Sequence, residues 1–381
     1  MRVCLDISSA MTPHPTGIGR YAHQLACALL ELPDAPELSL FHNRRLTHQP
    51  PSGLEKQARS EAPWGDKPWR AFLLTGIKPP RNWGETIYQC DIFHGTDSIT
   101  PRIPQPTVIT IHDLTTLLFP QHHSGPNRWY QRAALPVMVR RAAAIITDSE
   151  STRQDCINRF QLPINKIHTI PVGVNHEHFF PRPRALAQSR VAQQLQLPVP
   201  YILAVGTLEP RKNLHRLIQA YARLDGKTPP LIIVGAKGWG QNPISELITE
   251  LGIQNRVYTP GFVADDLLPD LYSGAEFFIY PSLYEGFGSP VLEALACGAP
   301  VITSNVSSLP EVTGDAALLV DPLDVEAIAQ GMSMLLADTS LTRSLVERST
   351  GRASRFSWKR TAQETLDLYR QTYQQFGTAQ P

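Results

Sequence analysis

Two glutamates, Glu285 and Glu293, bracket a glycine-rich stretch with the clearest potential for chemistry in this sequence. The apolar run 277–280 before them predicts a strand buried on both faces of a parallel sheet. After the turn, Ser289 suits a helix N-cap, Pro290 the first helical position and Gly298 the helix C-terminus.

A helix starting at this place would make the turn an anion site. The amides of 288–292 would point into the crevice at the carboxyl end of the strand. Carboxylates on both sides, at positions 285 and 293, could accept hydrogen bonds from sugar hydroxyls beside a phosphate. The alternative is that one glutamate caps the helix electrostatically and the other lies on the surface.

Adjacent cations follow another predicted strand, 201–206. Arg211 and Lys212 come just before a predicted helix, where the helix dipole disfavours positive charge. Two cations are poorly suited to packing there and well suited to binding phosphate. The alternative is a pair of solvated cations.

Two features of the first half also fall at predicted strand ends. His112 and Asp113 end the strand 107–111, where open α/β sheets bind ligands. A metal role is disfavoured because no third ligand is nearby, and a hydrogen-bonded structural histidine is the alternative. Gly17 opens a predicted helix, but the preceding loop is too long for a dinucleotide fingerprint and His42 stands where an acidic residue is needed. We expect either a loop in which backbone approaches a ligand or an ordinary helix start.

Aromatic and basic residues alternate in two other stretches. Residues 49–88 are predicted to be irregular, and the helix 126–141 carries Arg128 and Arg132 on one face. Both patterns suit contact with an anionic membrane surface or a lipid-linked substrate. Packing of the loop on its own domain, and a solvated basic face of the helix, are the alternatives.

Length and composition predict a soluble protein of two domains. The chain has 381 residues, 42% hydrophobic and 18% charged, with a net charge of +1 that draws it to no nucleic acid. No signal peptide or membrane span is expected, and five scattered cysteines suit a cytoplasmic protein with reduced thiols. Strands alternate with helices in both halves, which predicts an α/β fold of two Rossmann-like, doubly wound parallel sheets facing across a cleft. We assign 1–178 and 179–357 to the two domains and 358–381 to a helix that crosses back to the first.

Together these motifs resemble the retaining glycosyltransferases of family GT4, which have the GT-B fold. The E-x7-E spacing of Glu285 and Glu293 and the turn 209–213 carry the resemblance, with 260–263, Gly17 and His112 in support. The likeness spans nearly the whole chain and is looser over 40–90.

The resemblance implies roles for individual residues. Lys212 and Arg211 would bind the diphosphate, Glu285 a hydroxyl of the donor sugar, Glu293 the ribose, and His112 would lie near the transferred sugar. Several relatives have arginine where this chain has Thr207, so either the diphosphate would have one cation fewer or Arg20 or Arg211 would compensate. The remaining expected contacts to the nucleotide sugar come from Gly17, Thr207, Gly261, Phe262, Val263, Gly286, Phe287, Gly288, Val291 and Leu292.

The resemblance also implies the reaction. The transferase would need no metal and no cofactor besides its donor, and it would retain the anomeric configuration. The sequence is most similar to bacterial mannosyl- and D-rhamnosyltransferases of lipopolysaccharide O-antigen synthesis. These imply a GDP-sugar donor and a glycan acceptor on undecaprenyl diphosphate, at the inner face of the cytoplasmic membrane. The alternatives are a UDP-sugar donor, a sugar-nucleotide epimerase, and a non-catalytic subunit that binds nucleotide sugar.

Overall fold

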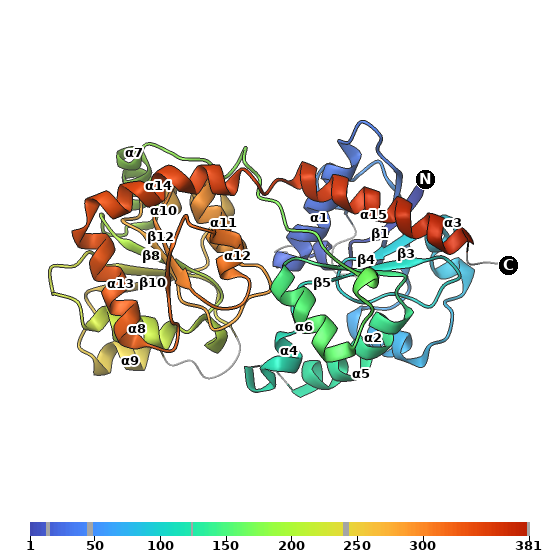
Figure 1. Cartoon of the computed structure of the whole chain (residues 1–381), viewed down its shortest axis with the longest axis horizontal. Helices are drawn as coiled ribbons and strands as arrows, with labels where there is room; N and C mark the ends of the chain where they lie inside the picture. The colour runs from blue at the N-terminus through green and yellow to red at the C-terminus, as the bar shows by residue number, and fades with distance from the viewer. Residues whose placement is uncertain (13–15, 44–48, 123–124, 239–243, 379–381) are drawn as a thin grey trace. The chain divides into compact units, whose positions relative to one another are not determined.

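The computed structural model describes residues 1–12, 16–43, 49–122, 125–238 and 244–378. They form two compact units. The first comprises Met1–Leu118, Gly125–Gly173 and Trp358–Pro381, and the second Phe119–Ser124 and Val174–Ser357 (Figure 1). The last helix of the chain therefore belongs with the first half of the sequence.

A seven-stranded parallel sheet forms the centre of the first unit, with the strand order β3-β2-β1-β4-β5-β6-β7. Every neighbouring pair is parallel, and the strand order reverses between β1 and β4. The strands are β1 (Arg2–Asp6), β2 (Glu37–Asn43), β3 (Ala58–Ala62), β4 (Ile92–Gly95), β5 (Thr107–Ile111), β6 (Ala144–Thr147) and β7 (Ile167–Thr169). Its central strands β4, β5 and β6 are buried along their whole length, as a sheet covered on both faces requires.

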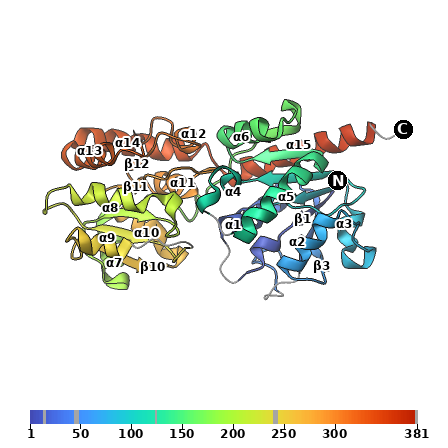
Figure 2. The same cartoon turned by 90° about the horizontal axis from the view of Figure 1, so that it is seen from below.

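Helices of the first unit connect these strands (Figure 2). They are η1 (Ser8–Ala10), α1 (Gly17–Leu30), α2 (Asp66–Thr75), η2 (Arg81–Trp83), α3 (Glu85–Gln89), α4 (Thr115–Leu118), α5 (Gly125–Arg141), α6 (Glu150–Phe160), η4 (Ile164–Lys166) and α15 (Trp358–Thr378).

The prediction that residues 49–88 are irregular is wrong. They contain β3, α2 and α3. The pattern of β3 is weak because it is the edge strand, in which only Ala62 is buried. Helix α2 buries Trp69 and Leu73, four residues apart, and ends at Gly76 with a left-handed φ of 71°. The aromatic residues of this stretch pack together, Trp64 on Phe72 and Phe72 on Trp83, so packing on their own domain accounts for them.

The C-terminal helix α15 lies beside α1 in the first unit. Its Tyr369 hydroxyl hydrogen-bonds His94 Nδ1 at 2.5 Å, and Thr361 donates to the Pro171 carbonyl at 2.7 Å. Burial lowers the pKa of His94 to about 3, so this ring stays neutral. The contacts tie the end of the described chain to β4 and to the segment after β7.

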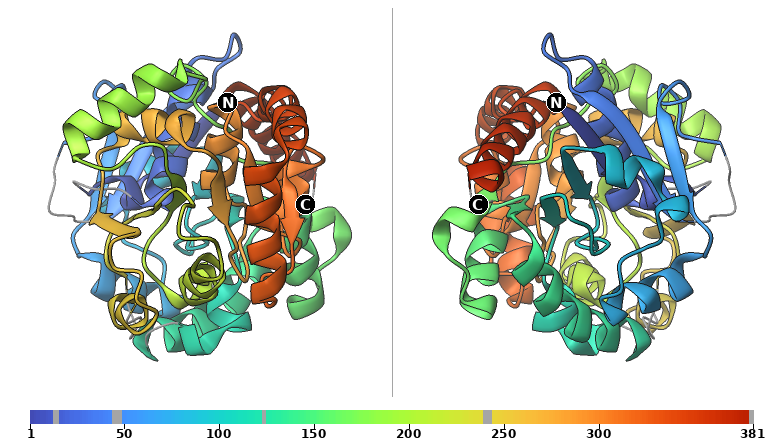
Figure 3. Two further views of the ribbon diagram at one scale, coloured as in Figure 1. Left: turned by 90° about the vertical axis from the view of Figure 1, so that its left-hand side faces the viewer. Right: turned by 90° about the vertical axis from the view of Figure 1, so that its right-hand side faces the viewer.

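The second unit contains a six-stranded parallel sheet in the order β10-β9-β8-β11-β12-β13. The strands are β8 (Ile202–Val205), β9 (Leu231–Val234), β10 (Val257–Gly261), β11 (Phe278–Tyr280), β12 (Val301–Ser304) and β13 (Leu318–Val320). The predicted fold of two doubly wound parallel sheets is confirmed, each with helices around its strands (Figure 3).

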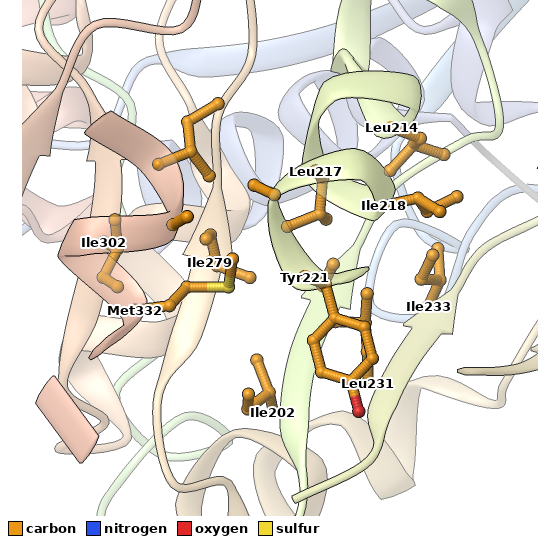
Figure 4. Packing of buried hydrophobic residues seen from close by; sticks show 14 of the residues in the cluster. Ile202, Leu214, Leu217, Ile218, Tyr221, Leu231, Ile233, Ile279, Ile302 and Met332 are labelled. Carbon is orange, nitrogen blue, oxygen red and sulfur yellow. The ribbon is translucent and has the colours of Figure 1, made fainter. Parts of the chain in front are cut away.

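The helices of the second unit complete its core. They are η3 (Pro120–His122), α7 (Arg184–Leu195), η5 (Pro210–Lys212), α8 (Leu214–Ala222), α9 (Ile244–Glu250), η6 (Asp265–Leu267), α10 (Leu268–Gly274), α11 (Ser289–Ala296), α12 (Leu309–Thr313), α13 (Val325–Ala337) and α14 (Thr339–Ala353). Leu217 and Tyr221 of α8 pack with Ile202, Leu231 and Ile279 of the strands (Figure 4). Truncating a buried leucine such as Leu217 to alanine would cost about 2–5 kcal/mol. This rigid core supports the loops at the carboxyl ends of β8 and β11. Among the described residues, no helix is long and apolar enough to cross a membrane.

Candidate active site

The second unit brings three predicted residues, Glu285, Lys212 and Arg211, into direct contact. Glu285 follows β11, and the two cations form η5 after β8, the neighbouring strand. Lys212 Nζ lies 2.7 Å from Glu285 Oε1, and an Arg211 guanidinium nitrogen lies 2.6 Å from Glu285 Oε2. Each carboxylate oxygen therefore has its own cation.

Neutral groups complete the surroundings of Glu285. The hydroxyl of Tyr280 donates to Oε1 at 2.9 Å and that of Ser282 at 2.6 Å, while Lys212 also donates to the Tyr280 hydroxyl. The Ser307 hydroxyl accepts from the Glu285 backbone N–H at 3.0 Å. Glu285 is only 6% exposed, so its side chain is held in one orientation before any ligand arrives.

Electrostatics keep this carboxylate ionised. Burial alone would raise the pKa of Glu285, but the charges of Arg211 and Lys212 and the hydrogen bonds from Lys212 and Ser282 outweigh it and lower the pKa to about 2. Burial lowers the pKa of Lys212, and Glu285 opposes that change. With Glu209, which accepts from Arg211 at 2.6 Å, the cluster holds two cations and two anions.

Asn213 fixes the turn that carries the cations. It has a left-handed φ of 59°, a conformation that asparagine tolerates better than most residues. Its amide donates to the carbonyls of Pro281 at 3.0 Å and Pro322 at 2.6 Å. The position ends the turn 209–213 in the sequence, and its structural role was not predicted.

The loop after β8 is held by a close backbone approach. A Cβ atom at Gly235 would lie 1.9 Å from the Gly206 carbonyl oxygen, so only glycine fits at 235. Thr207, which follows, is exposed, and the aliphatic stem of Lys212 lies against Gly206. Thr207 is exposed, although its Cγ2 lies close to Gly238, and it stays a predicted ligand contact.

The start of α11 differs from the prediction by one residue. The N-cap is Gly288, with φ 101°, and Ser289 is the first helical residue and makes no side-chain cap. Glycine is needed because the backbone is left-handed and a Cβ would approach Leu309 to 2.7 Å. The predicted Ser289 cap is therefore wrong.

The expected row of free amides is also shorter than predicted. The amides of Val291 and Leu292 donate to the Gly288 carbonyl at 2.9 and 3.3 Å, and Pro290 has no N–H. The amides of Gly288 and Ser289 come before these bonds. The predicted anion site is thus limited to the first residues of this helix and the turn before it.

Glu293 lies in α11, and the segment 261–263 begins at the last residue of β10. Glu293 Oε2 accepts from the hydroxyl of Tyr272 at 2.9 Å, a partner that sequence spacing did not indicate. Gly261 ends β10 with φ 85°, Phe262 is 60% exposed and Val263 is buried. Among the predicted contacts, Phe287, Val291 and Leu292 have buried side chains, so only their backbone could meet a ligand.

His112 lies in the first unit, after β5, and both ring nitrogens are hydrogen-bonded. Nδ1 is 2.7 Å from Asp148 Oδ2, and Nε2 is 2.9 Å from the Thr96 carbonyl. Tyr21 packs edge-on against the ring. Burial would lower the pKa of His112, but the charge and hydrogen bond of Asp148 outweigh it and raise the pKa to about 9. His112 is thus an imidazolium in a fixed position at neutral pH. These contacts also fit the alternative of a hydrogen-bonded structural histidine. Its place near the transferred sugar stays a prediction.

Gly17 is the first residue of α1 and is exposed. A Cβ built at this position would meet no atom within 4 Å, so the fold itself does not require glycine there. A ligand that comes close to the backbone would explain the glycine. Among the described residues, no group of three or more His, Cys, Asp or Glu side chains could hold a metal ion.

Comparisons with known proteins bear on both units. A family described as "Glycosyltransferase Family 4" matches residues 15–178, and one described as "Glycosyl transferases group 1" matches residues 187–352. An O-antigen chain mannosyltransferase B of Escherichia coli is 35% identical over 370 residues, which cover 93% of this chain and 96% of the relative.

Two further proteins extend the comparison. The serotype-specific mannosyltransferase WbdA of Escherichia coli is 31% identical over 82% of this chain, which spans 39% of that longer protein. A sucrose-phosphate synthase of Thermosynechococcus elongatus superimposes with a TM-score of 0.77 at 22% identity, covering 98% of this chain and 99% of that one. The last likeness concerns the fold.

Proposed function

The chain belongs to the glycosyltransferases and has the GT-B fold, and from that premise we propose that it transfers mannose or D-rhamnose from a GDP-sugar to a lipid-linked glycan of O-antigen synthesis. The observation that carries the proposal is the pair of largely buried cations, Arg211 and Lys212, on Glu285. Burying a charge costs free energy that pairing offsets only in part, so two cations at one place suggest a function. A diphosphate leaving group requires such cations. The 35% identity to a mannosyltransferase of O-antigen chains supports the choice of sugar and of glycan.

In the proposed reaction, the bond between the anomeric carbon and the β-phosphate oxygen breaks, and its electron pair leaves with GDP. The acceptor hydroxyl oxygen forms the new bond on the same face, and its proton passes to the departing phosphate. Lys212 and Arg211 stabilise the negative charge that develops on the diphosphate. The configuration at the anomeric carbon is retained, and no metal is needed in this scheme.

Besides pairing with the cations before the donor binds, Glu285 has a proposed role in binding the donor sugar. The cluster of Arg211, Lys212, Glu209 and Glu285 is neutral before the donor binds. A diphosphate carries more negative charge than one carboxylate, so it would replace Glu285 as a partner of Lys212. Glu285 would then accept a hydrogen bond from a hydroxyl of the donor sugar, while Glu293 would bind the ribose.

Attachment to the inner face of the cytoplasmic membrane is also part of the proposal. What supports it is the exposed face of α5, where Trp129 is 68% exposed next to the exposed Arg128 and Arg132. An indole between guanidinium groups suits the boundary of an anionic bilayer. The acceptor would be a glycan on undecaprenyl diphosphate, which is held at that surface.

Nucleotide binding and transfer test this function. The purified protein is titrated calorimetrically with GDP, UDP and ADP, with and without EDTA, and is then assayed with GDP-mannose and GDP-D-rhamnose. We expect preference for GDP that EDTA does not change, followed by transfer from one of the two donors. Preference for UDP would move the donor to a UDP-sugar. GDP binding without turnover on native acceptor would indicate a non-catalytic subunit.

A further inference from the structure

A small polar pocket lies in the first unit, where the strand order of the sheet reverses. It is lined by residues that follow β1 (Ser8 and Ser9), β4 (Thr96 and Asp97) and by the last residue of β2 (Asn43). In open α/β sheets this reversal, at the carboxyl ends of the strands, is where ligands bind. The residues proposed to bind the donor, most of which lie in the second unit, do not include those that line this pocket.

The pocket is too small for a sugar ring. The space open to the centre of a water-sized sphere is about 20 Å³. One water needs roughly 10–15 Å³ on this measure. It therefore admits a single hydroxyl or hydroxymethyl group, while the rest of the ligand stays outside.

Two lining oxygens make no hydrogen bond to the part of the chain that the structure describes. Neither Asn43 Oδ1 nor Ser9 Oγ has a hydrogen-bond partner among the residues that the structure describes, although both atoms are buried. Asn43 is only 2% exposed, and its position is fixed because its backbone N–H donates to Ser8 Oγ at 3.0 Å. Buried polar atoms without partners are rare in native proteins, and each needs an explanation such as a bound group.

The charged groups of the pocket add further oxygen acceptors. Arg70 contributes the positive charge, and it is shared between Asp66 at 3.0 Å and Asp97 at 3.1 Å. Asp6 also lines the pocket and accepts from the Ser8 amide at 2.8 Å. Since three carboxylates and only one guanidinium line the pocket, an anion would be repelled. A group that donates hydrogen bonds, such as a hydroxyl, fits this lining.

The pocket is connected to the predicted active-site histidine through one residue. Thr96 lines the pocket, and its carbonyl bonds His112 Nε2 at 2.9 Å. The Thr96 hydroxyl donates to the Asp6 carbonyl at 2.6 Å. A hydroxyl in the pocket would therefore be held at a fixed position relative to His112.

We propose that this pocket recognises one hydroxyl group of the acceptor sugar, with Asn43 Oδ1 and Ser9 Oγ as its hydrogen-bond acceptors. The inference rests on the proposed function, since it assigns the acceptor side of the same transfer. A site that bonds a hydroxyl with buried groups discriminates strongly against the analogue that lacks it, because those groups are then left unpaired. The pocket thus selects acceptors by the presence of one hydroxyl.

The test measures binding of methyl α-D-mannopyranoside and its four monodeoxy analogues by ligand-observed NMR, with wild type, Ser9→Ala and Asn43→Ala. We expect one analogue to bind wild type at least about tenfold more weakly than the parent, and about as weakly as the parent binds Asn43→Ala. In Asn43→Ala the same deoxygenation should lower the affinity little further, because the substitution and the deoxygenation remove the same hydrogen bond.

Thermal unfolding gives an independent readout. Ser9→Ala removes an oxygen that has no partner among the described residues, so it should weaken binding of the parent glycoside while the Tm stays the same or rises. This variant keeps the test informative if Asn43→Ala folds poorly. Exposed Ser340→Ala and Asn158→Ala are matched controls that should change neither quantity.

Several outcomes would overturn the inference. If all four deoxy analogues bind like the parent, the pocket holds only a structural water. The same conclusion follows if the decreases in affinity caused by deoxygenation and by Asn43→Ala multiply, since the two changes would then act independently. Failure of the parent glycoside to bind would also overturn the inference. GDP binding is measured on the same samples: if GDP binds while the sugars fail, only this inference is lost, and if GDP also fails, the proposed function is lost too.

Discussion

The two sheets carry opposite chemistry at the carboxyl ends of their strands. At the carboxyl ends of β8 and β11 the second unit presents Arg211 and Lys212, whose charges are already paired with Glu285. Near the ends of β1 and β2 the first unit presents oxygens, and two of them, Ser9 Oγ and Asn43 Oδ1, have no partner among the described residues. The same parallel-sheet architecture therefore carries a cation cluster in one unit and an oxygen-lined pocket in the other, for which we propose a diphosphate and a hydroxyl group as the respective ligands.

The largest effect is expected from removal of a cation of the second unit. Lys212→Ala should lower the kcat of transfer by about 10²–10³-fold, because one group that stabilises the leaving diphosphate is lost. Its Tm should change much less than its kcat, since Arg211 still pairs with Glu285, although it then faces both Glu285 and Glu209. Initial rates and thermal unfolding check this, with exposed Lys227→Ala as the control. A large fall in Tm with normal turnover would show that the lysine only supports the fold.

Removing the negative charge sharpens the comparison next. The pKa of Glu285 in the folded protein is about 2, below its unfolded value of 4.5, so its stabilisation is present above pH 4.5 and disappears as the pH falls towards 2. The difference corresponds to about 3 kcal/mol. Glu285→Gln should lower the free energy of unfolding at pH 7 by about that amount and flatten its pH dependence between 4.5 and 2. Denaturant titrations at several pH values measure both, and an unchanged slope would contradict the ion cluster.

The histidine of the first unit has the opposite pH dependence. The pKa of His112 is raised from 6.5 to about 9, so its stabilisation is complete below pH 6.5 and is lost as the pH rises through 9. Asp148→Asn removes the charge that outweighs burial, and the pKa of His112 should fall below that of wild type. NMR titration of the imidazole reports this directly. A pKa that stays near 9 in the variant would rule out Asp148 as the cause.

The smallest expected effect concerns nucleotide affinity. Glu293→Ala should weaken GDP binding by roughly tenfold or more, as expected for a lost hydrogen bond to a charged group. Calorimetry with GDP measures this, and exposed Glu347→Ala serves as the matched control. Equal affinity of Glu293→Ala and wild type would remove Glu293 from the ribose site and leave the cation pair as the main nucleotide contact.

The sequence predicted well those features that are local in the chain. The β-α alternation and the strand ends at 285 and 211–212 could be located because each is continuous and marked by apolar runs or by charge. Two local details were wrong, the cap at Ser289 and the irregular stretch 49–88. Glycine with positive φ replaced the usual cap, and an edge strand carries little hydrophobic signal.

Features built from distant residues could not be predicted. Tyr272 of α10 meets Glu293 of α11, and Asn213 after β8 meets Pro322 after β13, only because the fold brings these distant segments together. The oxygen-lined pocket combines Ser9, Asn43 and Thr96, each an ordinary polar residue in its own segment. No spacing rule connects them, since their proximity follows from the strand order.

The return of α15 to the first unit sets an order of events during synthesis. The sheet β1–β7 has left the ribosome before the second unit is made, but Tyr369, the partner of His94, has not. At roughly 5–20 residues per second, making residues 174–357 takes about 10–40 s. During that time the nascent first unit exposes the surface that α15 later covers, including the buried imidazole of His94. The second unit has all its elements earlier, so the half of the protein that is translated first is the last to be completed.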